Sequence, residues 1–324
     1  MKSEPAVLVV ASLNADHIVQ ASRIPSPGET IMGHTLSREL GGKGGNQAIA
    51  SARLGAPTAA IACVGADDDG DDYLAALRAD GVNTRHVSQI ADHATGRAAI
   101  TVDDEGTNAI VVIAGANEAI PADTASRAFT DFEQLRVAVG QMEASVSATA
   151  AVFREARHRG IITVLNTAPA TESVPELVPW SDILVANEIE FQQITGQSSE
   201  DQKGLCRGAQ TLFDEGVRWV IVTSGEKGSV VLDGTEIIRV PAERVTAVDT
   251  TAAGDAFVGA VAAHLAGTEI FHHGEKPVVE AGQPVTTTSI VRACEAASRV
   301  SAVVVTRRGA HPSLPTLDEV RAIF

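Results

Sequence analysis

The sequence predicts one α/β domain in which helices cover both faces of a mostly parallel sheet. Short apolar runs rich in β-branched residues alternate with longer helical segments, and such runs are typical of strands buried on both faces. The 324 residues suffice for one large domain, and no Pro- or Ser-rich stretch is long enough to link two. We therefore expect residues 1–324 to form a single domain.

The elements follow in a regular order over the first two thirds of the chain. Strands are expected at 6–12, 58–65, 136–140, 161–166, 182–187 and 219–225, and helices at 44–55, 70–80, 145–159, 188–195 and 203–215. Next, SVVLDG and EIIRVPA form a hairpin-like pair around Asp233 and Gly234. Helices near 252–266 and 288–300 then complete the domain.

Two early regions depart from this alternation. Residues 17–40 and 95–115 have the alternating pattern of strands with turn residues between them, and the second is a hairpin about DDEG. We expect these strands to form a small second sheet that acts as a lid over the site. Its apolar face would be a natural surface for a homodimer. The alternative is an ordinary edge extension of the main sheet.

Composition argues against several classes of protein. The formal charge of −16 disfavours a general nucleic-acid or anionic-membrane surface. The three cysteines have no CxxC spacing, so they indicate neither a disulfide framework nor a zinc site. The apolar run in MKSEPAVLVVAS is too short for a signal peptide, and no 18-residue apolar span occurs. We expect a soluble cytoplasmic protein.

Polar residues recur where the expected strands end. Ligands of open α/β sheets bind at the carboxyl ends of the strands, so a series of polar residues at that edge predicts a cleft. The chain has neither a Walker A pattern nor G-x-G-x-x-G between a strand and a helix. The residues of this series are Asn14, Asp16, Gly65, Glu143, Asn166, Asn187, Glu190, Thr223 and Gly225.

The stretch DTTAAGDAF, Asp249 to Phe257, precedes an apolar helical run. An ordinary helix start is one interpretation, because Thr250 and Thr251 are good N-cap residues. However, if Thr251 were the N-cap, a capping box would need its acid at position 254, where glycine stands. The second interpretation is an anion site formed by the free backbone N–H groups of 252–255.

A second glycine cluster, GGKGGNQAIASARLG, covers Gly41 to Gly55. Its glycines let the backbone approach a small polar ligand closely, and Lys43 and Asn46 can donate hydrogen bonds. A flexible turn followed by a helix cap is the alternative interpretation.

Together these segments resemble the ribokinase-like (PfkB) family of sugar kinases. GGKGGNQAIASARLGAPTAAIACVGADDDG is similar to the first signature of the family, and DTTAAGDAFVGAVAAHLAG to the second. Other stretches resemble the ribokinase branch: SLNADH, PSPGETIMG, AGANEAI, LNTAPA, NEIEFQQITG and VTRRGAHPSLP. The resemblance runs from about residue 6 to the C-terminus. It implies a three-layer α/β/α fold with a mostly parallel central sheet and a small β-sheet lid.

The resemblance also implies a reaction, the transfer of the γ-phosphoryl group of ATP to the 5-hydroxyl of D-ribose. Asp255 would be the general base, and the backbone N–H groups of Ala252, Ala253, Gly254 and Asp255 would stabilise the phosphoryl charge. Deoxyribose, fructose or a nucleoside such as adenosine are alternative substrates. A sugar-binding protein without catalysis is a further alternative.

Ligand-binding residues follow from the same resemblance. The sugar would contact Asn14, Asp16, Gly42, Lys43, Asn46, Glu143 and Asp255. ATP would contact Asn187, Thr223, Ser224, Gly225, Glu226, Lys227, Gly228, Gly254 and Ser298. Glu190 would arrange Mg²⁺, directly or through a water. A K⁺ ion would be held by Asp249, Thr251, Val304, Arg307, Gly309 and Ser313, mostly through backbone carbonyls.

Three features depart from the family pattern. The stretch 268–289 is longer than usual, and its His272 and His273 are typical of a surface loop rather than a metal site. Ser298 stands where Asn or His is expected near the adenine. Thr167 replaces a common proline.

Overall fold

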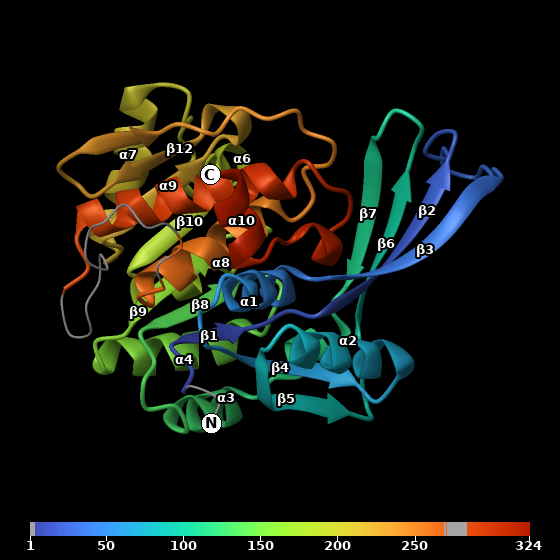
Figure 1. Cartoon of the computed structure of the whole chain (residues 1–324), viewed down its shortest axis with the longest axis horizontal. Helices are drawn as coiled ribbons and strands as arrows, with labels where there is room; N and C mark the ends of the chain where they lie inside the picture. The colour runs from blue at the N-terminus through green and yellow to red at the C-terminus, as the bar shows by residue number, and fades with distance from the viewer. Residues whose placement is uncertain (1–3, 269, 271–283) are drawn as a thin grey trace.

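The computed structural model describes residues 4–268, 270 and 284–324. Two sheets dominate it (Figure 1). The strands are β1 (Val7–Val10), β2 (Asn14–Ala21), β3 (Gly33–Gly41), β4 (Thr58–Gly65), β5 (Asn83–Ile90), β6 (Gly96–Val102), β7 (Asn108–Ile113), β8 (Val137–Gln141), β9 (Ile162–Asn166), β10 (Ile183–Asn187), β11 (Trp219–Thr223), β12 (Ser229–Leu232) and β13 (Ile237–Val240).

Helices connect and cover these strands. They are α1 (Lys43–Arg53), α2 (Asp68–Ala79), α3 (Ala122–Thr130), α4 (Val146–His158), α5 (Val174–Leu177), α6 (Glu188–Thr195), α7 (Gln202–Asp214), α8 (Ala253–Leu265), α9 (Thr287–Val304) and α10 (Leu317–Ile323). None of the helices in the described ranges is long and apolar enough to cross a membrane.

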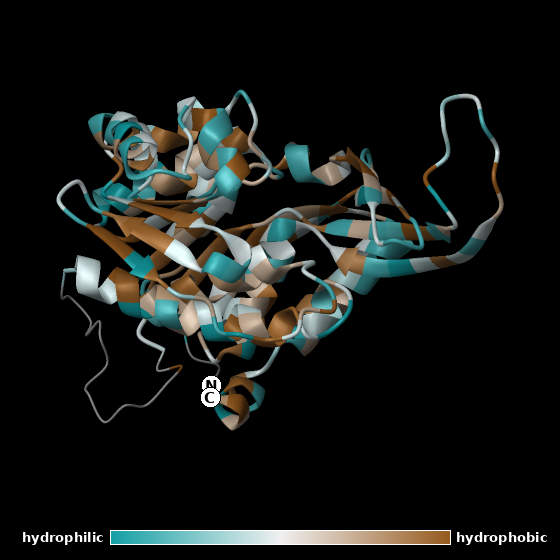
Figure 2. Ribbon diagram, turned by 90° about the horizontal axis from the view of Figure 1, so that it is seen from above, coloured by the Kyte–Doolittle hydropathy of each residue, from teal (hydrophilic) through white to brown (hydrophobic). Residues whose placement is uncertain are grey.

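The main sheet has the order β13-β12-β11-β10-β9-β8-β1-β4-β5 and is parallel from β11 through to β5. In β1, Val7 and Val9 face one core with α1, α8 and α9, whereas Leu8 and Val10 face the other core with α3, α4 and α7. Figure 2 shows the hydrophobic colour concentrated on these central strands. The expected three layers are confirmed, since a strand buried on both faces requires helices on both sides.

The expected elements are present with small shifts of their ends, and the Asp233–Gly234 hairpin forms between β12 and β13. Sequence analysis missed β5, α3, α5 and α10. Strand β5 is a half-exposed edge strand with the polar sequence NTRHVSQI, so it lacks the apolar run that identified the other strands. Most of 268–289, including His272 and His273, lies outside the described residues.

The second sheet has the order β3-β2-β6-β7, with β2 and β6 parallel and the other pairs antiparallel. It extends from one side of the main sheet (Figure 1). The regions 17–40 and 95–115 therefore form a separate sheet, and the edge extension of the main sheet is excluded. Its exposed apolar side chains include Leu36, Ile110, Val111, Val112 and Ile113.

Candidate active site

The site lies where the N-termini of α1 and α8 meet the carboxyl ends of the main strands. Helix α1 begins after Gly42, whose φ of 86° is in the left-handed region. Helix α8 begins after Ala252, which has a φ of 59° and provides no side-chain cap. The interpretation of Thr251 as an N-cap is therefore wrong. Its hydroxyl donates to Oδ1 of Asp249 instead (2.6 Å).

Asp255 is buried at the start of α8 and receives two amide hydrogen bonds from α1. Nδ2 of Asn46 donates to Oδ2 of Asp255 (2.9 Å), and Nε2 of Gln47 donates to Oδ1 (3.3 Å). Burial raises the pKa of Asp255, while Lys43 and the two amides oppose the rise. Asp255 is thus a carboxyl group of increased basicity in a protected position.

The start of α8, which carries Asp255, also has free backbone N–H groups. Within the described residues, those of Ala252, Gly254 and Asp255 make no hydrogen bond, whereas that of Ala253 donates to Thr250 O (3.2 Å). A Cβ built on Gly254 would meet no atom within 4 Å. The helix start therefore offers donors beside open space, which is the requirement for an anion site.

Glu143 holds the glycine-rich turn in place. Its Oε2 accepts hydrogen bonds from Lys43 N and Ser12 Oγ, both at 3.0 Å, and Ser12 Oγ accepts one from Gly44 N (3.0 Å). Nζ of Lys43 lies 3.9 Å from Oε1 of Glu143. Burial would lower the pKa of Lys43, but Asp255 and Glu143 outweigh it and the pKa is raised. Lys43 is thus a cation among carboxylates.

Asn14 and Asp16 lie in β2, the first strand of the small sheet. Oδ1 of Asn14 accepts from Nδ2 of Asn117 (2.8 Å), which orients the Asn14 amide. The carboxyl group of Asp16 packs against Gly41 at the end of the neighbouring strand β3. A Cβ at position 41 would lie 2.0 Å from Oδ2 of Asp16, so only glycine fits there. Burial and the negative charges of Glu143 and Glu39 raise the pKa of Asp16 to about 7, although Lys43 opposes them.

The segment predicted to bind nucleotide lies at the ends of β10 and β11. Asn187 and Glu190 form a capping box, with Glu190 N donating to Oδ1 of Asn187 (2.8 Å) and Asn187 N donating to Oε2 of Glu190 (2.9 Å). Residues 223–228 form a tight turn closed by Ser224 N and Gly228 O (2.8 Å). In this turn, Gly225, Glu226 and Lys227 form a 3₁₀ helix. Ser298 donates to Pro241 O (3.3 Å), which ties α9 to the chain that follows β13.

The residues predicted to hold K⁺ come from two segments that the structure brings together. Oδ1 of Asp249 accepts from Thr251 N (2.9 Å), and Oδ2 accepts from Gly309 N (2.9 Å). Val304 O accepts from Arg307 N (3.0 Å), and Ser313 donates its hydroxyl to Ala310 O (2.7 Å). Partial burial would raise the pKa of Asp249, but the hydrogen bonds from Thr251 and Gly309 outweigh it and the pKa is lowered.

The described ranges contain no group of three or more His, Cys, Asp or Glu residues that could hold a metal ion. A cation at the Asp249 segment would therefore depend on backbone carbonyls.

Sequence analysis missed the supporting residues Ser12, Gln47 and Asn117. Asn166 was noted only as a polar residue at a strand end, yet its Oδ1 accepts from Nε2 of Gln47 (3.0 Å). Gln47 follows Asn46 directly within the glycine-rich segment. Its position next to a predicted ligand-binding residue is the feature of the sequence that could have identified it.

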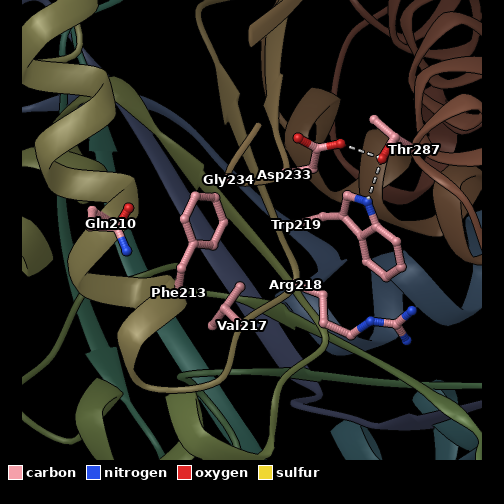
Figure 3. A pocket seen from close by; sticks show the side chains of 8 residues that line it. All are labelled: Gln210, Phe213, Val217, Arg218, Trp219, Asp233, Gly234 and Thr287. Carbon is pink, nitrogen blue, oxygen red and sulfur yellow. Dashed lines mark hydrogen bonds between the residues drawn. The ribbon is translucent and has the colours of Figure 1, made fainter. Parts of the chain in front are cut away.

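A separate hollow of about 400 Å³ opens beside Trp219 (Figure 3). It lies at the amino end of β11, whereas Asp255 lies at the carboxyl end of the sheet. Nε1 of Trp219 donates to Thr287 Oγ1 (3.1 Å), which donates to Oδ2 of Asp233 (2.6 Å), so these polar groups are already paired. The hollow is therefore distinct from the candidate active site.

Comparison with known proteins identifies similar chains. Residues 5–317 match the model of the pfkB family of carbohydrate kinases. A ribokinase of Mus musculus is 39% identical over 264 residues, covering 81% of this chain and 82% of that protein. A ribokinase of Haemophilus influenzae is 33% identical over 311 residues, covering 96% and 95%. The structure of Arabidopsis thaliana ribokinase complexed with ribose and ATP has a TM-score of 0.84 and 28% identity over 99% of each chain.

Proposed function

The chain belongs to the pfkB family of carbohydrate kinases, and we propose that it transfers the γ-phosphoryl group of ATP to the 5-hydroxyl of D-ribose. The observation that carries the proposal is the position of Asp255. Its buried carboxyl group belongs to the helix start that has free N–H groups, and it is contacted by the helix that carries Lys43 and Asn46. This arrangement joins a proton acceptor, an anion site and a polar ligand site.

In the proposed reaction, Asp255 accepts the proton of the sugar hydroxyl as O5 bonds to the γ-phosphorus. The bond from that phosphorus to the bridging oxygen breaks, and ADP leaves with the electron pair. The N–H groups of Ala252, Gly254 and Asp255, and that of Ala253 if it turns from Thr250, donate to the phosphoryl oxygens. Phosphoryl transfer requires mainly positioning and charge stabilisation, both of which this helix start can supply.

The sugar is proposed to contact Asn14, Asp16, Lys43, Asn46 and Glu143, with Gly42 giving close access to the backbone. These groups are buried or half-buried, and within the described residues Oδ1 of Asn46 has no hydrogen-bond partner. A missing sugar hydroxyl would leave such groups unpaired, so we propose that the site prefers ribose to deoxyribose.

ATP is proposed to lie along Asn187 and the 223–228 turn, with its γ-phosphate at Gly254 and its adenine near Ser298. Glu190 would hold hydrated Mg²⁺, because the capping box engages only its Oε2 and leaves Oε1 available. The ion would neutralise phosphate charge.

K⁺ is proposed to bind the carbonyls of the two segments that Asp249 joins, with Thr251 on one side and Val304, Arg307, Gly309 and Ser313 on the other. When bound, the ion would order the loop that precedes the free N–H groups. The direct connection from Asp249 to both Thr251 and Gly309 supports this assignment.

We also propose a homodimer that buries the exposed apolar face of the small sheet, since Leu36 is 71% and Val111 65% exposed. A cytoplasmic location, where ATP is available, is part of the same proposal.

A coupled assay of ADP release tests the proposed substrate. The panel is ribose, deoxyribose, fructose and adenosine, each with K⁺ and with choline in its place. Ribose should give the highest kcat/KM, and K⁺ should raise it. Another substrate that exceeds ribose tenfold would contradict the sugar assignment, and sugar binding without turnover would favour a non-catalytic binding protein.

A further inference from the structure

Two neighbouring amides of α1 contact opposite oxygens of Asp255. Asn46, 4% exposed, belongs to the proposed sugar site, whereas the NH₂ group of Gln47, 1% exposed, contacts only other side chains of the protein. Nε2 of Gln47 is shared between Oδ1 of Asp255 (3.3 Å) and Oδ1 of Asn166 (3.0 Å). Gln47 therefore connects the carboxyl group on α8 with the end of β9.

Asn166 determines which way the Gln47 amide faces. Nδ2 of Asn166 donates to Val185 O (3.3 Å), and a backbone carbonyl can only accept. Oδ1 of Asn166 must therefore face Gln47, which must present its NH₂ group. If the Gln47 amide were reversed, its oxygen would face two other acceptor oxygens, those of Asn166 and Asp255.

This orientation has a cost within the folded chain. Oε1 of Gln47 is buried and has no hydrogen-bond partner among the described residues. An unpaired buried acceptor destabilises a protein, so its presence requires a compensating interaction. The donation of Nε2 to Asp255 and Asn166 provides that interaction.

We propose that Gln47 is a positioning residue, which Asn166 orients so that it fixes Oδ1 of Asp255 and favours the ionised carboxylate. The carbonyl of Val185 thus sets the direction of a hydrogen-bond series that runs through β9 and α1 to the base. The catalytic consequence rests on the proposed function, but the effect on the ionisation of Asp255 does not.

Carbon-13 NMR of labelled aspartate carboxyl groups tests the ionisation directly. The Asp255 signal is assigned from its loss in Asp255→Asn. Gln47→Leu should raise the pKa of Asp255 by about one unit, a tenfold rise in proton affinity, because a donor to the charged form is lost. Asn166→Leu, which keeps Gln47, should give a smaller rise in the same direction. The double variant should not exceed Gln47→Leu.

Gln141→Leu is the matched control. Gln141 stands beside Asn166 in the register of β8 and β9, is also fully buried and has an unpaired Oε1. Its Nε2 donates to Val10 O, and among the described residues no side-chain hydrogen bond joins it to Asp255 or Asn166. This variant should leave the Asp255 titration unchanged. An unchanged titration in Gln47→Leu, or an equal shift in Gln141→Leu, would overturn the proposal.

Kinetics then separate positioning from sugar binding. In Gln47→Leu, kcat should fall about tenfold and the acid limb of its pH profile should move up with the pKa of Asp255, because the base must be ionised. The KM for ribose should change less than threefold. A rise in KM that matches the fall in kcat, with the limb unmoved, would overturn the positioning role. If the wild type phosphorylates no sugar, the proposed function fails, whereas the NMR result still decides the role of Gln47.

Discussion

Asp249 and Asp255 lie six residues apart in one stretch, yet their environments have opposite effects on their carboxyl groups. Asp249 is half-buried in a loop, and hydrogen bonds from Thr251 and Gly309 lower its pKa. Asp255 is buried under α1, and burial raises its pKa despite two amide donors. One short stretch of sequence therefore holds two carboxyl groups of different chemistry.

The difference comes from the partners that the fold supplies. Asp249 receives three hydrogen bonds, two of them from Thr251 in its own turn. Both donors to Asp255 come from α1, more than 200 residues earlier in the chain. One carboxylate stabilises a loop, whereas the other is held as a proton acceptor at the end of a helix.

Asp255→Asn should have the largest effect, because the proposed base is lost. We expect kcat to fall by roughly three orders of magnitude. ATP binding, measured by calorimetry, should remain within a few-fold of the wild type because the helix start is preserved. Activity above a few per cent of wild type would show that Asp255 is not the base.

Two glycines of α8 provide the next contrast. Gly254→Ala should fold normally, because its Cβ meets no atom within 4 Å, but the methyl group would occupy the proposed phosphate position. We expect kcat to fall about 100-fold with an unchanged or higher melting temperature. Steady-state assays and calorimetric melting measure both effects.

Gly259→Ala is the matched substitution on the same helix and should behave in the opposite way. Its Cβ would lie 2.7 Å from Ala50 Cβ and from Gln47 O, so α1 and α8 would have to separate. The melting temperature should fall clearly. A fall in the melting temperature of Gly254→Ala as large as that of Gly259→Ala would remove the argument for an anion site at Gly254.

The sequence identified most of the fold because its buried strands are continuous apolar runs. Strand β5 was missed because none of its residues is buried and no apolar pattern marks it. The helix expected near 252–266 is present as α8, but its N-cap is Ala252 rather than a threonine that propensity favours, because the hydroxyl of Thr251 bonds to Asp249. Competition between two hydrogen-bonding partners is not visible in propensities.

For the site, glycine-rich motifs and polar strand ends indicated segments that the structure brings together. The supporting contacts were not predictable in the same way. Gln47 and Asn166 are 119 positions apart, and their contact depends on how α1 packs against β1, β4 and β8 of the main sheet. Likewise, Asn187 was assigned to ATP and Glu190 to Mg²⁺ by resemblance alone, while their spacing also satisfies a capping box.

Asp249→Asn should have a smaller effect than either change at α8. The asparagine oxygen can still accept from Thr251, but its NH₂ group would face the N–H of Gly309. We expect activity to fall about tenfold and half-activation to require more K⁺, because the loop before the helix is less ordered. Activity titrated against KCl at constant ionic strength measures this.

Asp233→Asn is the control for Asp249→Asn. Asp233 accepts similar bonds from Thr235 N and Oγ1, and from Thr287, but lies at the other end of the sheet. Asp233→Asn should lower the melting temperature without changing the K⁺ concentration needed for half-activation. An equal K⁺ response of the two variants would contradict a specific role for Asp249.

The smallest expected effect is a difference in the pH dependence of stability. The pKa of Asp16 is raised from 3.8 to about 7 in the folded chain, so the folded state binds the proton more tightly and loses stability as pH rises through that interval. Asp16→Asn should therefore raise the melting temperature at pH 8 by about 3 °C and change it little at pH 4.

The ionisation of Asp249 has the opposite effect on the pH dependence of stability. Its lowered pKa stabilises the fold above pH 3.8, and this contribution disappears as pH falls below that value. Asp249→Asn should accordingly destabilise the protein at pH 8 and have less effect near pH 3. If both variants shifted the melting temperature in the same direction at pH 8, burial and hydrogen bonding would not be the causes that distinguish these carboxylates.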